Sequence, residues 1–72
     1  MTIQLNGDPY ELAEPVTVSA LLDALAIDPR RVAVELNLTV LKRAAFPTTT
    51  IQAGDTMEIV NFVGGGAAAA RG

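Results

Sequence analysis

Three consecutive glycines, Gly64 to Gly66, close the last apolar segment and are the residues here with the most distinctive chemical use. Glycine has no Cβ, so a glycine-ended peptide fits a narrow tunnel and brings its backbone close to a ligand. A terminal carboxylate on such a tail would reach into the active site of another enzyme. The alternative is a plain flexible linker, and the residues alone leave both interpretations open. A phosphate-binding loop is excluded, because no Lys-Ser or Lys-Thr pair follows the glycines.

The rest of the chain holds few groups that could catalyse a reaction. It contains no His and no Cys, which excludes a Ser–His or Cys–His pair, an imidazole base and the usual zinc sites. Ser19 therefore has no histidine to activate it. The carboxylates of Glu11, Glu14, Asp23 and Asp28 are interpreted as solvated surface charges. The sequence predicts neither catalytic residues nor a metal site in this chain.

Charge and composition narrow the classes of partner. Five basic and eight acidic residues give a net charge of -3, and the aromatic residues are one Tyr and two Phe. An acidic chain with so few aromatic rings makes a poor nucleic-acid binder. The apolar stretches are too short to span a membrane. The first residues lack a basic region before an apolar core, so we expect no signal peptide and a cytoplasmic location. We also expect a monomer when the protein is free.

A chain of 72 residues makes one domain at most. Apolar alternation predicts strands over residues 2–5, 9–13, 32–36, 38–41 and 57–63. Asn6-Gly7 predicts a hairpin turn between the first two strands, and Pro9 places the second strand at a sheet edge. Residues 42–50 are expected to be irregular, with a turn of helix before Pro47.

One amphipathic helix is predicted after the second strand. Thr17 is its expected N-cap, and Asp28-Pro29 is its expected end, because the residue before proline disfavours the α region. Its apolar stripe should pack on one face of the sheet. The predicted core combines that stripe with inward strand residues: Val18, Leu21, Leu22, Leu25, Ile3, Leu5, Val34, Met57 and Ile59.

This order of elements predicts an α+β fold: a mixed sheet of four to five strands with one main helix on one face. The folded domain should cover residues 1–63. Residues 64–72 should form a flexible glycine- and alanine-rich tail, because they carry no apolar periodicity.

Several short motifs in order resemble the ThiS family, the small sulfur carriers of thiamine thiazole synthesis. They are Asn6-Gly7 after the first strand, Thr17-Val18 before Leu21-Leu22, Val32-Ala33-Val34 before Asn37, Gly54-Asp55, and Glu58-Ile59-Val60 running through Phe62-Val63 into the glycines. The resemblance covers Thr2 to Gly66. It implies the β-grasp, or ubiquitin-like, fold, with the first and last strands parallel and adjacent in the middle of the sheet.

The resemblance also implies a chemistry for the tail. In that family the carboxylate of the terminal Gly-Gly pair is adenylated with ATP by an activating enzyme of the ThiF type and then converted to a thiocarboxylate. The sulfur passes to thiazole synthase (ThiG type). Carried over, Gly66 would bear the reactive carbonyl, and Gly64 and Gly65 would thread the tail into the partner. The carrier would bind no cofactor, since ATP is used by the activating enzyme.

One feature departs from the family pattern. Six residues, Ala67 to Gly72, follow Gly66, and an internal Gly66 has no free carboxylate. The preferred interpretation is removal of the extension after Gly66. Two alternatives stay open: the small subunit of molybdopterin synthase, which shares the fold and the glycine tail, and a β-grasp binding module whose tail is inert.

A partner surface should lie beside the tail. Val60 and Phe62 share the face of the last predicted strand that is opposite Met57 and Ile59. If the helix covers the Met57 face, Val60 and Phe62 are open to solvent and form a candidate hydrophobic anchor for the partner. The alternative is that Phe62 folds onto its own sheet.

Overall fold

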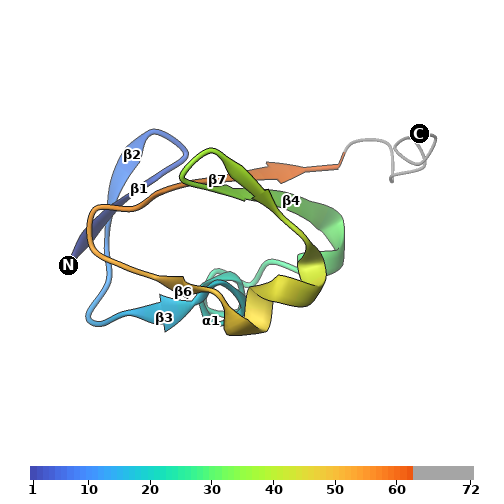
Figure 1. Cartoon of the computed structure of the whole chain (residues 1–72), viewed down its shortest axis with the longest axis horizontal. Coiled ribbons are helices and arrows are strands. Elements are labelled where there is room, and N and C mark those ends of the chain that lie inside the picture. The colour runs from blue at the N-terminus through green and yellow to red at the C-terminus, as the bar shows by residue number, and fades with distance from the viewer. Residues whose placement is uncertain (63–72) are drawn as a thin grey trace.

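The computed structural model describes residues 1–62. One five-stranded sheet has the order β2-β1-β7-β4-β5, and a small second sheet pairs β3 with β6. Figure 1 shows the large sheet on one side and α1 with the small sheet on the other. The strands are β1 (Thr2–Leu5), β2 (Asp8–Glu11), β3 (Val16–Thr17), β4 (Val32–Leu36), β5 (Thr39–Leu41), β6 (Thr50–Ile51) and β7 (Thr56–Asn61). The helices are α1 (Val18–Ala24) and the 3-10 helices η1 (Pro29–Arg31) and η2 (Arg43–Thr48).

The topology of the large sheet confirms the predicted fold class. β1 and β7 are parallel neighbours in its interior, and every other pairing in it is antiparallel. The hairpin turn lies at Asn6-Gly7, whose φ angles of 51° and 86° are both positive, as the sequence predicts. β2, which contains Pro9, is an edge strand. A second tight turn at Asn37-Leu38 also has two positive φ angles and joins β4 to β5.

Helix α1 begins where the sequence predicts and ends earlier. The Thr17 hydroxyl accepts a hydrogen bond from the Ala20 amide at 3.0 Å, which is the expected N-cap. The prediction that Asp28-Pro29 ends the helix is wrong, because α1 stops at Ala24. Ala26 has a φ of 59°, its amide donates to Asp23, and the Ile27 amide donates to Leu22. This pattern is a Schellman cap built on alanine instead of the usual glycine.

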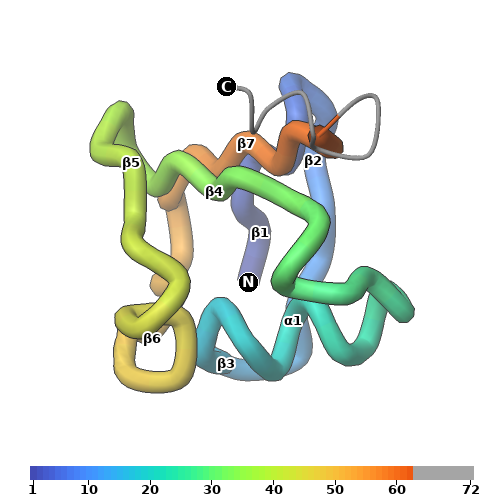
Figure 2. Tube along the Cα trace, turned by 90° about the vertical axis from the view of Figure 1, so that its right-hand side faces the viewer, coloured from blue at the N-terminus to red at the C-terminus, as the bar shows by residue number. Residues whose placement is uncertain are grey.

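The core lies between the large sheet and α1 (Figure 2). Six of the predicted core residues are buried; the other three, Leu5, Leu25 and Ile59, are half-buried against it. Leu25 is less buried than predicted because it is the C-cap of α1 instead of a residue of its interior. The buried residues are Ile3, Leu12, Val18, Leu21, Leu22, Val32, Val34, Leu36, Phe46, Ile51 and Met57.

The segment between β5 and β7 is more ordered than the sequence suggested. The 3-10 helix η2 includes Pro47 instead of ending before it. Phe46 from η2 is buried in the core, and Ile51 from β6 is fully buried. The short ladder of β3 with β6 had no signal in the sequence, since each strand is only two residues long. Together these elements add Phe46 and Ile51 to the core beside α1.

Candidate functional site: the last strand and the open face of the sheet

Strand β7 leads into the glycine tail, and two turn asparagines hold it in place. The Asn6 side chain accepts a hydrogen bond from the Ile59 amide at 2.7 Å and donates to the Ile59 carbonyl at 3.2 Å. It thereby continues the pairing of β1 with β7 after the β1 backbone has turned away. The Asn37 side chain likewise accepts from the Thr56 amide at 2.9 Å. Strand β7 is therefore fixed at its start and at its centre by side chains from separate hairpins.

The end of β7 is anchored to the segment that precedes β4. The Phe62 amide donates to the Arg31 carbonyl at 2.9 Å. Arg31 belongs to η1, where Asp28 caps the helix and pairs with Arg30 at 2.9 Å. Hydrogen bonds from the Arg30 side chain and from its backbone amide lower the pKa of Asp28 to about 2. Both arginine side chains remain exposed, and the backbone of Arg31 holds Phe62, the last described residue.

The predicted exposure of Val60 and Phe62 is confirmed. The two side chains are 58% and 47% exposed. Val60, on β7, lies on the face of the sheet opposite Met57, and Phe62 directly follows the end of β7 at Asn61. Since α1 packs on the Met57 side, this outer face has no element of the described chain over it. That the two residues bind a partner stays a prediction.

The same face carries residues that the sequence analysis did not single out. Val40, on β5, is 67% exposed. Glu35, on β4, pairs with Val40 on one side and with Glu58 of β7 on the other. The alternation in β4 already indicated that Glu35 points outward. The pairing of Glu35 with Glu58 depends on strand register, which no local pattern in the sequence reveals.

Other kinds of site find no support in the described residues. Within residues 1–62, no three acidic side chains come together in a way that could hold a metal ion. In the same range, every buried side-chain polar atom has a hydrogen-bond partner. None of the described helices has the length and apolar character needed to cross a membrane. Gly64, Gly65 and Gly66, the predicted reactive tail, lie outside the described residues.

Comparison with known proteins places this arrangement in a family. The family model of the ThiS family matches residues 3–66 of this chain. The chain belongs to the ThiS family. The match ends at Gly66, the third of the three glycines and the residue that the resemblance identifies as reactive.

Solved structures agree with this membership of the ThiS family. The crystal structure of a thiamine biosynthesis protein (ThiS) from Geobacter metallireducens is 43% identical and superposes with a TM-score of 0.81. The match covers 92% of this chain and 100% of that one. A solution structure of a thiamine biosynthesis protein from the same organism gives a TM-score of 0.77. These likenesses confirm the β-grasp fold.

Curated relatives are similar over the same part of the chain. An uncharacterized protein, ycf40, of Porphyra purpurea is 39% identical over 66 residues, which cover 92% of this chain and 93% of that protein. A thiazole synthase of Paramagnetospirillum magneticum is also 39% identical over 66 residues, but these make up only 20% of its length. A segment similar to this chain is thus part of a much longer protein named thiazole synthase.

Proposed function

We propose that this protein is a sulfur carrier of thiamine biosynthesis, acted on by partner enzymes and not itself an enzyme. The observation that carries the proposal is the family match, which runs from the first strand to Gly66 and stops there. A match that ends on the last of three glycines supports Gly66 as the residue that becomes the carboxyl terminus. The names of the relatives favour thiazole synthesis over the molybdopterin pathway that the sequence left open.

The chemistry proposed for Gly66 follows from the weakness of a carboxylate as an acyl donor. One oxygen of the Gly66 carboxylate attacks the α-phosphate of ATP, and pyrophosphate leaves. A donor at the oxidation level of sulfide then attacks the acyl carbon. A carbon–sulfur bond forms, the carbon–oxygen bond to AMP breaks, AMP leaves, and the product is the thiocarboxylate. The chain supplies no His or Cys for these steps, so the side chains that catalyse them come from the activating enzyme.

Two partners follow from this chemistry. The first is the adenylating enzyme, which uses ATP. The second is thiazole synthase, which takes the sulfur. The thiazole synthases that contain a segment similar to this chain support it as a partner. Both enzymes must bind the body of the carrier close to the tail. The exposed Val60, on β7, and Phe62, just after that strand, are proposed as the apolar contact for the adenylating enzyme.

The extension from Ala67 to Gly72 makes a sharp test available. Adenylation needs a free α-carboxylate, so a chain ending at Gly66 should react and the full chain should not. Each form is incubated with the activating enzyme, ATP and a sulfur donor, and its intact mass is measured. The thiocarboxylate adds roughly 16 Da, the difference between a sulfur and an oxygen atom. In the shortened chain, Gly65→Val should impair the reaction, because a Cβ clashes where the backbone threads closely.

The outcomes separate the alternatives. If the shortened chain gains no mass with an enzyme of proven activity, the protein is a binding module with an inert tail. If the full chain gains the mass, Gly72 is the reactive terminus and the assignment of Gly66 is wrong.

A further inference from the structure

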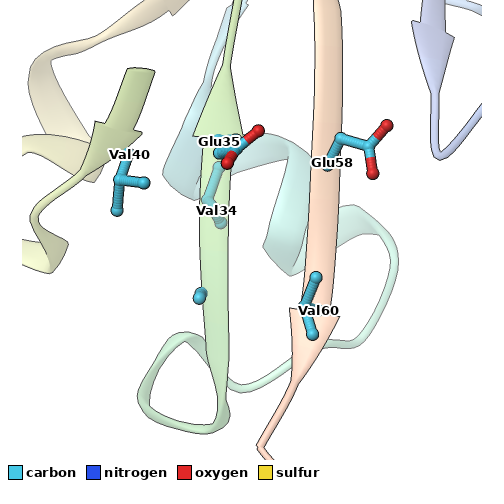
Figure 3. A pocket seen from close by; sticks show the side chains of 6 residues that line it. Val34, Glu35, Val40, Glu58 and Val60 are labelled. Atoms are coloured by element: carbon cyan, nitrogen blue, oxygen red, sulfur yellow. The ribbon is translucent and has the colours of Figure 1, made fainter. Parts of the chain in front are cut away.

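The outer face of the sheet contains a shallow groove between β5 and β7. Its volume is about 140 Å³, and apolar atoms form most of its surface. Figure 3 shows side chains from β5, β4 and β7 around it. The lining residues are Ala33, Val34, Glu35, Val40, Glu58 and Val60.

The depth of the groove comes from one small residue. Ala33 on β4 is paired with Val60 on β7, while Val40 on β5 lies diagonally across from it. The alanine methyl group leaves a depression between two exposed valines. The floor and both walls of this part of the groove are therefore aliphatic.

Two carboxylates stand at one end of the groove. Glu35 and Glu58 are directly opposite each other in the ladder of β4 with β7, so their Cβ atoms are about 4.5–5.5 Å apart. Like charges in this position destabilise a sheet. The ion pairs found within residues 1–62 involve Glu11 and Asp28, and neither member of the Glu35–Glu58 pair takes part in one.

An aliphatic trough that ends at two carboxylates matches one kind of side chain. Arginine has an apolar stem, which lies well along aliphatic surface, and a planar guanidinium whose donors reach two carboxylates at once. Binding it would also remove the repulsion within the Glu35–Glu58 pair. Strand β7 lines one side of the groove and precedes the glycine tail in the sequence, and Val60 is two residues before Phe62.

We infer that the groove receives an arginine side chain of the adenylating enzyme, with its stem over Ala33 and its guanidinium between Glu35 and Glu58. The inference rests on the proposed function, since that function supplies the partner. It adds the chemistry of the contact: a cation of the enzyme meets the acidic pair while the tail lies in the active site.

The test is a calorimetric titration of the full chain with the adenylating enzyme at two salt concentrations. Glu58→Gln and Glu35→Gln should each raise Kd tenfold or more and reduce its dependence on salt. Ala33→Leu should raise Kd as well, because the longer side chain fills the trough without changing the charge. Glu14→Gln is the matched control: Glu14 is an exposed glutamate before β3, and its replacement should leave Kd unchanged.

Thermal unfolding of the same variants separates a lost contact from a damaged fold. Both glutamine variants should melt at or above the temperature of the unsubstituted chain, because the like-charge pair is gone. Weaker binding together with unchanged or higher stability is the expected signature.

Three results would overturn the inference. Unchanged binding by both glutamine variants would remove the arginine contact and leave the proposed function intact. If the glutamine variants bind thiazole synthase more weakly but bind the adenylating enzyme as before, the groove contacts thiazole synthase and the inferred partner is wrong. No binding by the unsubstituted chain, and no mass gain by the chain ending at Gly66, would remove the proposed function together with the contact.

Discussion

Replacing Asn6 tests how the strand that carries the tail is held. The Asn6 amide makes two hydrogen bonds to the backbone of Ile59, at 2.7 and 3.2 Å, across 53 residues of sequence. Asn6 also has a φ of 51°, in the left-handed region that glycine tolerates best. Asn6→Gly therefore removes the two hydrogen bonds without adding backbone strain, and Asn6→Ala removes them and adds strain.

The expected magnitude follows from these two contributions. Each hydrogen bond contributes about 0.5–1.5 kcal/mol net. Because Asn6 is exposed, water can replace part of the interaction, so Asn6→Gly should cost about 1–2 kcal/mol in the free energy of unfolding. Asn6→Ala should cost about 1–2 kcal/mol more, the penalty for a Cβ in the left-handed conformation. For a domain of this size, 1 kcal/mol corresponds to about 4–8 °C in Tm.

Urea denaturation and thermal melts measure both variants, and hydrogen exchange at the Ile59 amide reports the local bond. Asn61→Ala is the control, since Asn61 lies on the same strand and is exposed; it should change stability by less than about 0.5 kcal/mol. The reasoning is refuted if Asn6→Gly is as stable as the unsubstituted chain and its Ile59 amide exchanges no faster.

Three other predictions concern the core, pH and the docking surface. Leu22→Ala should cost about 2–5 kcal/mol in urea denaturation, whereas Asp23→Ala on the exposed side of α1 should stay within about 0.5 kcal/mol; a small effect of Leu22→Ala would place that residue outside the core. Because Arg30 lowers the pKa of Asp28 from 3.8 to about 2, the stabilisation is complete above pH 3.8 and is lost as the pH falls toward 2. Thermal melts of Asp28→Asn should accordingly lose less stability than the unsubstituted chain over that range, and equal losses would contradict the assignment. Phe62→Ala should weaken binding to the adenylating enzyme by about 1 kcal/mol or more with the fold intact; titration calorimetry beside a melt checks it, and unfolding or unchanged binding would exclude the anchor.

Local patterns in the sequence were enough for most of the fold. Asn6-Gly7 indicated the first hairpin because only a few residue types accept two positive φ angles in succession. Thr17 indicated the start of α1 through its hydroxyl. The alternation of apolar residues in β4 and β7 indicated which side of each strand faces the core. In each case the physical cause acts over a few residues, and a sequence displays such causes directly.

Three features of the fold could not be predicted from local sequence patterns. The helix ends at Ala24 because Ala26 adopts a left-handed conformation. A glycine at this position would have predicted the helix end, whereas an alanine does not. Phe46 and Ile51 become core residues only when their segment packs across the end of α1. The Asn6 side chain also bonds the backbone of Ile59, 53 residues away. No local pattern indicated this contact, because the tight turn was already a sufficient reason for an asparagine at position 6.

The site divides in the same way. The sequence alone determined that the chain has no histidine or cysteine chemistry and that its last apolar segment is followed by three glycines. It also predicted that Val60 points away from the core. Only the tertiary structure decided that this face is open and that Glu35 stands beside Glu58 at one end of the groove. The physical reason is that strand register is set by packing between segments distant in sequence, and a pair of like charges across two strands exists only once that register is formed.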